Sequence, residues 1–309
     1  MYNQTTSEVL MVRPCAFGYN PQTASNNAFQ HKENEDRAQK LALAEFDSYV
    51  ELLRSFGVKV NVIEDTPEPH TPDSIFPNNW FSTHSDGTMV LYPMFAKNRR
   101  LERKQAVIDY LIENYDIRNI CDLTGYEGKN MFLEGTGSMV IDREHGMVYA
   151  CRSPRTHETV LKEFCKVFGW KYCIFSANDS AGSSIYHTNV MMSVGSRFAV
   201  VCLESITDRA ERDKVSNELS NAGKHIIEIS FEQMNNFAGN MLELKSVGNK
   251  DISVNQPLLV MSSAAKMALQ LNQIQLLKSY YNIVSPELHN IEVNGGGSAR
   301  CMLAEIFIK

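Results

Sequence analysis

Short apolar runs and one long helical pattern open the chain. Residues 9–12 are apolar throughout, which predicts a buried strand, and residues 34–56 place apolar side chains near one face of a helix. Gly57 follows as a helix stop, and residues 58–62 then alternate as a half-buried strand does. Strand, helix and strand in this order indicate an α/β fold.

Polar tetrapeptides then recur along the chain, each directly before a strand-like apolar run. They are residues 76–79, 134–137, 186–189, 237–240 and 298–301. Their last positions lie 51 to 61 residues apart, and a period of this size is typical of a repeat architecture. We therefore expect five β/α units around a pseudo-fivefold axis, with the tetrapeptides lining the axis at one end. An open doubly wound sheet is the competing fold, but the first strand–helix turn lacks its Gly-rich fingerprint.

The contents of each period agree with this interpretation. A turn and a second apolar strand follow the first strand, and a capped helix is expected to begin near Asn98, Thr156, Thr207 and Ser263. Two helices should stop at Gly169 and Gly223, before strands at 171–174 and 225–229. The run 302–308 predicts a buried strand that completes the unit begun by residues 9–12. We expect residues 1–309 to form one domain.

Composition excludes several classes of function. The formal charge is −6, from 30 basic and 36 acidic residues without blocks of like charge, so nucleic acid and anionic membranes are not expected as partners. No run of about 18 apolar residues predicts a membrane span, and residues 1–6 do not resemble a signal peptide. Seven irregularly spaced cysteines without Cys-x-x-Cys favour a reducing, cytoplasmic location over a disulfide framework.

If the tetrapeptides converge, one cavity collects a set of polar side chains. These are Asn79, Glu134, His187, Asn189 and Cys301, with Asp73 and Asn78 nearby. Taken singly, the cysteine could be a small buried hydrophobe, the histidine a core residue and the glutamate a surface residue. Their equivalent places in three repeats favour a function, because Cys, His and a carboxylate are the nucleophile, base and orienting group of covalent catalysis.

Metals and nucleotide cofactors are not expected. The eight histidines show no paired ligand spacing. The glycines 295–297 do not form a phosphate loop, because neither a Lys-Ser/Thr pair nor a predicted helix follows them.

The fivefold repeat and three motifs resemble a known superfamily. The motifs are Glu134-Gly135, His187-x-Asn189 and the three glycines three residues before Cys301. Over essentially the whole chain they resemble the guanidino-group-modifying, or pentein, enzymes: arginine deiminases, dimethylarginine dimethylaminohydrolases, amidinotransferases and citrulline hydrolases. The resemblance implies a five-bladed β/α propeller.

The resemblance also implies residue roles. Cys301 would be the nucleophile that forms a covalent, thiouronium-type intermediate, His187 the general acid and base, and Glu134 its acidic partner. Residues 73–79 would bind substrate. Arg155 would hold the substrate's α-carboxylate, with Arg99 or Arg100 as a weaker candidate for the same end.

This chain departs from the guanidine-binding relatives at three positions. Asn78 and Asn79 stand where those relatives carry acidic residues, and Asn189 replaces the aspartate of the arginine deiminases. An amide cannot neutralise a guanidinium, but it can donate to and accept from a neutral ureido group. We therefore expect a ureido amino acid, with citrulline hydrolysed to ornithine, ammonia and carbon dioxide. Asp73 leaves arginine or a methylated arginine open.

Two other functions remain as alternatives. An amidinotransferase would differ in whether an amine or water reaches the intermediate, which the sequence does not reveal. A non-enzymatic binding protein of the same fold would not need Cys301, His187 and Glu134 together. We expect a small amino-acid substrate and leave a homodimer open. The sequence does not reveal which segment closes over the site, and the Asn- and Gln-rich loop 16–34 is a candidate.

Overall fold

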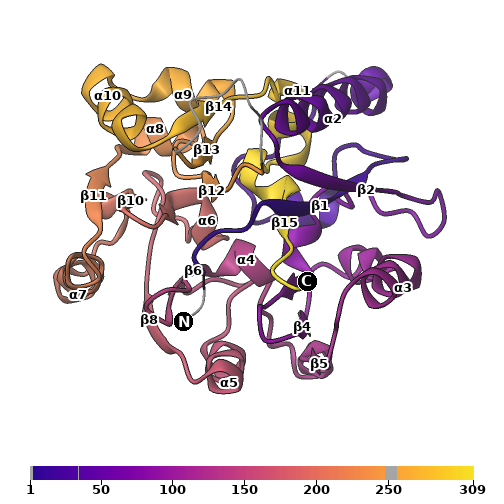
Figure 1. The fold of residues 1–309 in the computed structure, drawn as a ribbon, viewed down its shortest axis with the longest axis horizontal. Coiled ribbons are helices and arrows are strands. Elements are labelled where there is room, and N and C mark those ends of the chain that lie inside the picture. Colours follow the sequence, from indigo (N-terminus) through magenta and orange to yellow (C-terminus); the bar gives the residue numbers. More distant parts are fainter. Residues whose placement is uncertain (1–2, 34, 248–255) are drawn as a thin grey trace.

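The computed structural model describes residues 3–33, 35–247 and 256–309. Within these residues the strands form five three-stranded sheets, which follow one another around a common centre (Figure 1). Every sheet has the same plan: its central strand is antiparallel to one neighbour and parallel to the other. The chain is thus a mixed α/β fold built from one repeated unit.

The first sheet joins the two ends of the chain. It contains β15 (Ala304–Glu305), β1 (Glu8–Arg13) and β2 (Lys59–Glu64), in that order. The next two sheets are β3 (Phe81–Thr83), β4 (Thr88–Leu91) and β5 (Asn119–Asp122), then β6 (Val140–Asp142), β7 (Met147–Cys151) and β8 (Lys171–Phe175). The last two are β9 (Met192–Val194), β10 (Phe198–Val201) and β11 (His225–Glu228), then β12 (Leu242–Leu244), β13 (Leu258–Val260) and β14 (Asn282–Val284).

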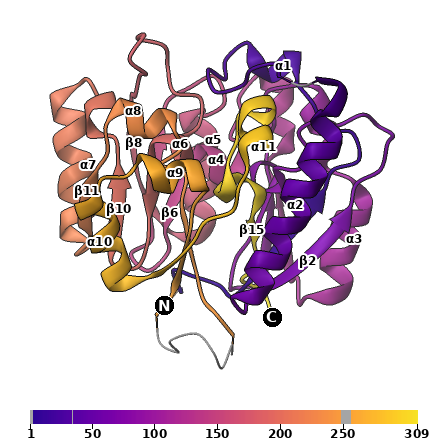
Figure 2. The same ribbon diagram turned by 90° about the horizontal axis from the view of Figure 1, so that it is seen from above.

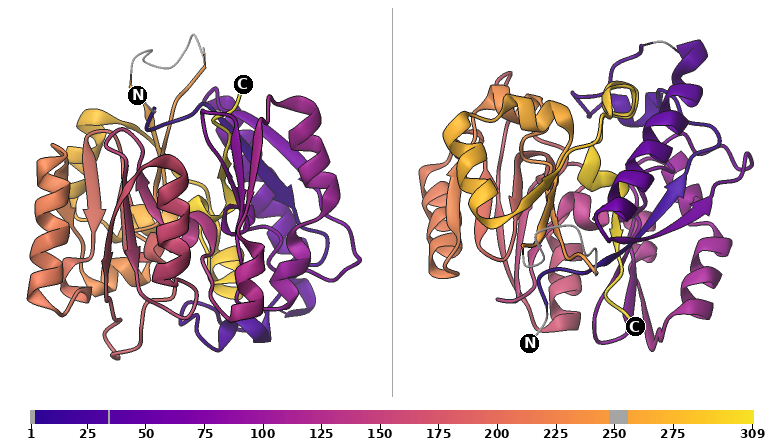
Figure 3. Two further views of the ribbon diagram at one scale, coloured as in Figure 1. Left: turned by 90° about the horizontal axis from the view of Figure 1, so that it is seen from below. Right: turned by 45° about the horizontal axis from the view of Figure 1, so that its top comes forward.

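A helix on the outside of each sheet connects its two parallel strands (Figures 1 and 3). These helices are α2 (Ala38–Ser55), α3 (Gln105–Asn114), α5 (Glu158–Phe168), α7 (Arg209–Asn221) and α10 (Leu271–Tyr280). A crossover of this kind is what joins parallel strands in one sheet. The remaining α-helices outside the centre are α1 (Pro21–Ala24), α8 (Phe231–Asn235), α9 (Ser263–Ala268) and α11 (His289–Gly295).

Short helical turns stand at the centre, directly before the first strand of a unit. They are η2 (Pro77–Asn79), α4 (Gly135–Ser138), α6 (Thr188–Met191) and η6 (Ala299–Met302). The other 3₁₀ segments are η1 (Glu35–Arg37), η3 (Asn98–Glu102), η4 (Thr124–Lys129) and η5 (Leu203–Ser205). Seen from the side, α1 lies at one face and the C-terminus at the opposite face (Figure 2).

Most expected helix boundaries agree with the structure to within two residues. Helix α7 begins after Asp208, whose side chain accepts from the Glu211 N–H, and α5 ends at Gly169 with a φ of 65°. The helix expected near Asn98 is a correction: η3 lies there and α3 begins only at Gln105. The tighter 3₁₀ turn places the Arg99 side chain in the interior.

The strand expected at 302–308 is also shorter than predicted. Cys301 belongs to η6, where its N–H bonds to the Ser298 carbonyl, and β15 has two residues. Directly after β15, the N–H of Ile306 still bonds to the Glu8 carbonyl of β1 at 2.9 Å, and the N–H of Phe307 then bonds to the Thr83 hydroxyl of the next sheet. The prediction that no helix follows the glycines 295–297 was also wrong, because the 3₁₀ segment η6 begins at Ala299.

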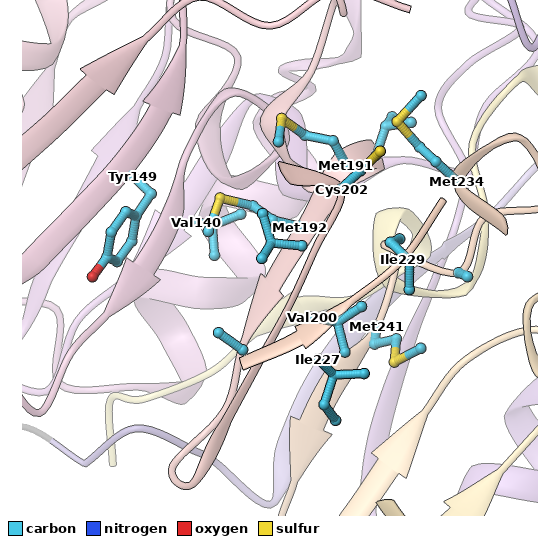
Figure 4. Packing of buried hydrophobic residues seen from close by; sticks show 14 of the residues in the cluster. Val140, Tyr149, Met191, Met192, Val200, Cys202, Ile227, Ile229, Met234 and Met241 are labelled. Carbon is cyan, nitrogen blue, oxygen red and sulfur yellow. The ribbon is translucent and has the colours of Figure 1, made fainter. Parts of the chain in front are cut away.

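Apolar side chains fill the spaces between the sheets. One buried cluster packs Met191 and Met192 against Val200, Ile227 and Met241, so that β9–β11 share a core with the neighbouring units (Figure 4). This burial is the main source of favourable free energy for such a fold. In the described parts of the chain, no helix is both long enough and apolar enough to traverse a bilayer.

The tetrapeptides meet at the centre, as the repeat predicts. The Asn240 amide donates to the Asn189 carbonyl at 2.9 Å and accepts from the Arg300 N–H at 3.0 Å. A Cβ added to Gly137 would lie 2.3 Å from Asn79 Nδ2, and one added to Gly239 would lie 2.3 Å from the Val190 carbonyl oxygen. Glycine at these two positions allows neighbouring units to approach this closely.

Gly239→Ala should therefore destabilise the fold. Its new methyl group would overlap backbone atoms of Val190 and Met191, so the free energy of unfolding should fall by about 1–3 kcal/mol in urea denaturation. Gly128→Ala is the matched control, because no atom lies within 4 Å of the added Cβ there. Equal stability of the two variants would contradict this account of the centre.

Candidate active site

A small cavity of about 20 Å³ lies where the tetrapeptides meet. Among the expected site residues, those that line it are Asp73, Asn79, Arg99, Arg155, His187 and Cys301. The glycines 295–297, Phe76, Tyr186 and two residues of loop 16–33 complete its wall. A volume of this size holds about one water molecule, so an amino acid enters only if part of the wall moves.

Cys301 lies beneath the glycine segment and faces amide donors. The Phe76 ring packs so closely on Gly295 and Gly297 that a Cβ at either would lie within 2.9 Å of it. The Cys301 side chain is buried, and its sulfur accepts from Asn240 Nδ2 at 3.3 Å and from Asn189 Nδ2 at 3.5 Å. Donors aimed at a sulfur stabilise negative charge on it.

His187 is held in one tautomer by Glu134. Its Nε2 lies 2.7 Å from Glu134 Oε2, and since a carboxylate only accepts, Nε2 carries the proton and Nδ1 is left to accept one. Burial lowers the pKa of His187 to about 4, although the hydrogen bond to Glu134 opposes the shift. The imidazole is therefore neutral near pH 7 and able to act as a base.

Glu134 is a fully buried carboxylate surrounded by positive charge. Its Oε2 lies 3.5 Å from Arg155 Nη1 and 3.8 Å from Arg99 Nη1, and its Oε1 accepts from the Phe95 N–H at 3.0 Å. Burial alone would raise the pKa of Glu134, but Arg155, His187 and Arg99 together hold it well below its usual value. Glu134 thus stays ionised inside the protein.

Arg99 lies in the inner wall of the cavity. Glu102 accepts from its Nε and Nη2 at 2.8 and 2.9 Å, and its Nη1 donates to Asn79 Oδ1 at 2.9 Å. Its Nε also lies 3.7 Å from Asp73 Oδ2. Arg100, the alternative to Arg99, is turned away from the cavity: it donates to the Met94 carbonyl at 3.0 Å.

Two of the side chains that line the cavity carry a buried polar atom without a hydrogen-bond partner among the described residues. Because Asn79 Oδ1 accepts from Arg99, its Nδ2 is a donor, and this atom has no hydrogen-bond partner among the described residues. Asp73 Oδ2 accepts from Asn20 at 2.7 Å and from Thr23 at 3.1 Å, while Oδ1 likewise lacks a partner in residues 3–33, 35–247 and 256–309. Burial raises the pKa of Asp73, against the opposing effect of Arg99.

Asn78 and Asn189 contact the site without lining the cavity in the described structure. Asn78 Nδ2 donates to Thr136 Oγ1 at 3.2 Å, and Asn189 Nδ2 donates to the Cys301 sulfur at 3.5 Å. Sequence reasoning placed Asn240 at a repeated position but did not select it as a site residue. Its equivalence to Asn79 and Asn189 in the repeat was the available signal.

The candidate closing loop does cover the cavity. In loop 16–33, Asn27 donates to the Gly296 carbonyl at 3.2 Å and Gln30 to the Asn294 carbonyl at 2.8 Å, while Asn20 and Thr23 hold Asp73 on the opposite wall. Asn34, the last residue of the predicted loop, lies outside the described residues. We call residues 16–33 the lid loop.

Arg155 connects the lid loop to Glu134. Its guanidinium lies 4.8 Å from the centre of the Tyr186 ring, and it is 2 % exposed. Its Nε donates to Asn26 Oδ1 at 3.0 Å and its Nη2 to the Thr23 carbonyl at 2.9 Å. Within the described ranges, no group of three or more His, Cys, Asp or Glu side chains is arranged to hold a metal ion.

Glu134→Gln should destabilise the protein because Arg155 and Arg99 lose a buried counter-charge, while the volume of the side chain stays almost the same. Removing one charge from a buried ionic network leaves the other charges uncompensated, so unfolding free energy should fall by about 3 kcal/mol. Asp116→Asn is the control, since its pair with Arg118 is exposed and should contribute less than about 1 kcal/mol. Denaturant unfolding of both variants measures the difference, and a Glu134→Gln protein as stable as the parent would exclude this role.

Comparison with known proteins is consistent with this geometry. A family model described as "N,N dimethylarginine dimethylhydrolase, eukaryotic" matches residues 13–308. None of the curated proteins matches the chain.

Solved structures share the fold at low identity. The N-terminal domain of ArgZ, an arginine dihydrolase from Cyanobacteria solved as a cysteine-to-serine mutant bound to substrate, has a TM-score of 0.74 at 15 % identity, covering 96 % of this chain and 97 % of that chain. The full-length ArgZ structure is covered to 40 %. Dimethylarginine dimethylaminohydrolase (DDAH) from Pseudomonas aeruginosa, a cysteine-to-serine mutant complexed with citrulline, has a TM-score of 0.66 at 14 % identity, covering 98 % and 100 %.

The family match over nearly the whole length, together with these shared folds, leads to one conclusion. The chain belongs to the N,N-dimethylarginine dimethylhydrolase family, within the pentein superfamily of guanidino-group-modifying enzymes.

Proposed function

We propose that the protein is a cysteine-dependent hydrolase of the ureido group of an amino acid, with citrulline as the first candidate. The observation that carries this proposal is the pairing of Asn79. Its carbonyl is occupied by the buried Arg99, and its amide N–H₂ is unpaired among the described residues. This N–H₂ group lies against Gly137, on the same side as His187 Nδ1, in a residue that lines the cavity. A ureido oxygen can accept from that donor, whereas every polar atom of a guanidinium is itself a donor.

The charges around the cavity support the same proposal. Glu134 already faces Arg155 and Arg99, and Asp73 lies near Arg99. A guanidinium bound at Asn79 would approach the Arg99 cation, and two like charges 4 Å apart repel by about 4 kcal/mol at an effective dielectric constant of 20. A neutral ureido group avoids that repulsion.

The proposed reaction uses Cys301 and His187 in turn. The thiol proton passes to His187 Nδ1 as the sulfur attacks the ureido carbon, and Asn79 Nδ2 donates to the ureido oxygen. His187 then protonates the leaving nitrogen, which departs as ammonia and leaves a thiocarbamate on the sulfur. Water attacks next, giving up a proton to His187, and the released carbamate loses carbon dioxide to leave ornithine. Glu134 keeps the imidazole oriented throughout.

The other site residues bind or position in this proposal. Arg155 pairs with the substrate's α-carboxylate, and Asp73 Oδ1 accepts from a substrate N–H group. Asn189 and Asn240 donate to the sulfur that attacks, while Asn78 supports the ring of tetrapeptides through Thr136. The Arg99 side chain serves as the internal cation that orients Asn79.

A guanidino substrate is the second candidate, favoured by the match to the dimethylarginine dimethylhydrolase family and by the free oxygen of Asp73. With arginine or dimethylarginine the same steps would pass through a thiouronium, and an amine in place of water would make the enzyme an amidinotransferase. A binding protein without activity would have no use for the His187–Glu134 pair beside Cys301.

We also propose that the sheets are the five blades of a single β/α-propeller domain over residues 1–309. Supporting this, every sheet in the described residues has the same strand order and the same crossover position. The axis of the propeller would pass through the cavity.

Incubation with citrulline, arginine and dimethylarginine should separate the candidate reactions. We expect ornithine and ammonia from citrulline, with slower or no release from the other two, measured by amino-acid chromatography and an ammonia assay. Cys301→Ser should abolish turnover while leaving the unfolding transition unchanged. Citrulline accumulating from arginine, without attack on citrulline itself, would exclude the ureido proposal, and full activity of Cys301→Ser would exclude the mechanism.

Asn79→Asp should shift preference from the ureido to the guanidino substrate. A carboxylate beside Arg99 removes the donor to the ureido oxygen and supplies an acceptor for a cation. The ratio of kcat/KM for arginine to that for citrulline should rise about 30-fold or more. This factor corresponds to a change of about 2 kcal/mol in relative transition-state binding, at about 1.4 kcal/mol per tenfold change.

The exposed Asn236→Asp substitution is the control for added charge and should leave the ratio unchanged. An unchanged ratio in Asn79→Asp would show that Asn79 does not contact the ureido group.

A further inference from the structure

One edge of the Arg155 guanidinium is already occupied by the lid loop. Nε and Nη2 both donate to the same oxygen, Asn26 Oδ1, and Nη2 also donates to the Thr23 carbonyl at 2.9 Å. The remaining nitrogen, Nη1, faces Glu134 at 3.5 Å. The guanidinium thus contacts the carboxylate of Glu134 through Nη1 and the neutral amide of Asn26 through Nε and Nη2.

The occupied edge is the one that would bind a carboxylate. Nε and Nη2 form a fork that matches two carboxylate oxygens, which is why arginine recognises carboxylates bidentately. Asn26 provides one neutral oxygen at this edge. The cavity beneath, at about 20 Å³, has no room for an amino acid while the lid loop stays where it is.

We propose that Asn26 occupies the position of the substrate's α-carboxylate, so that substrate enters by exchanging its carboxylate for Asn26 on Arg155. This rests on the proposed function and deepens it. Asn26 becomes a specificity-determining, positioning residue that restricts the enzyme to free amino acids. A ureido group within a peptide chain, or on an amino acid amide, lacks the group that displaces Asn26.

The exchange favours a carboxylate for an energetic reason. A charge-assisted hydrogen bond is roughly twice as strong as a neutral one, so a carboxylate gains free energy by replacing an amide oxygen, while another amide gains none. Near the glycines, the lid loop is attached through Asn27 and Gln30 by neutral hydrogen bonds. Its Asn20 and Thr23 side chains bond to the Asp73 carboxyl group on the opposite wall. On its outer side Phe29 borders a hollow of about 460 Å³, which gives this segment space to move.

Ligand binding to the full chain carrying Cys301→Ser tests the exchange without turnover. By calorimetry, adding Asn26→Ala should tighten citrulline binding about fivefold (about 1 kcal/mol), because the carboxylate no longer competes with the amide. Citrulline amide should tighten by at least the same factor, because it lacks the carboxylate that displaces Asn26 and therefore depends more on the removal of this side chain. Asn26→Asp should weaken citrulline about tenfold or more, since it places a permanent carboxylate on Arg155. In the active enzyme, Asn26→Ala should lower the KM for citrulline by more than it changes kcat.

Gln22→Ala is the matched control. It removes a different contact between the lid loop and the body, from the Asn98 N–H to the Gln22 side chain at 3.1 Å, without touching Arg155. It should leave the ratio of citrulline to citrulline amide affinity unchanged. If Gln22→Ala and Asn26→Ala tighten citrulline binding equally, a general loosening of the lid loop explains the effect and the proposal is overturned. Weaker citrulline binding in Asn26→Ala would also overturn it.

The same measurements separate this inference from the proposed function. Citrulline binding that is indifferent to Asn26 overturns the exchange and leaves the ureido hydrolase standing. Binding of arginine in place of citrulline overturns the ureido proposal, and the exchange is then judged by the same variants with arginine and argininamide. Binding of neither amino acid overturns both.

Discussion

The buried carboxylate of Glu134 is the interaction on which the site depends. It lies within hydrogen-bonding or ion-pair distance of His187, Arg155 and Arg99, each from a different repeated unit or connection. A charge without counter-charges could not remain there, and Arg155 needs Glu134 as its counter-charge, while Arg99 also pairs with Glu102. One residue therefore sets the tautomer of the base, fixes the cation that faces the lid loop, and balances the cation behind Asn79. Binding, orientation and chemistry are coupled through a single side chain.

Repetition explains how much of this could be predicted from the sequence. Equivalent positions in equivalent units must surround a common centre, so the tetrapeptides were sufficient to bring His187, Asn79 and Cys301 together without any knowledge of packing. The expected helix at Asn98 was wrong because local capping signals do not register that Arg99 is needed inside. Periodicity also could not show that β15 is two residues long.

The residues that the sequence did not reveal have a shared character. Asn26 lies in a loop outside the repeat, so no equivalence pointed to it, and its partner Arg155 is 129 positions away. Asn240 stands at a repeated position, but it was not selected there as a site residue. Contacts of this kind depend on how far a loop reaches across the centre, which is decided by tertiary packing and not by local pattern. The expectation of a neutral substrate group rests on Asn78, Asn79 and Asn189 and stays a prediction.

The pairing of β15 with β1 has a consequence for the order in which the protein becomes reactive. Cys301 is carried on the segment that joins the two ends of the chain, where Glu305 pairs with Val9. Contacts between such distant residues are the costliest to close, because the loop entropy is lost before the contact is gained. An incompletely folded chain therefore has its thiol apart from His187 and its amide donors. Cys301 therefore reaches His187 and its amide donors only when the two ends of the chain have paired and the fold is complete.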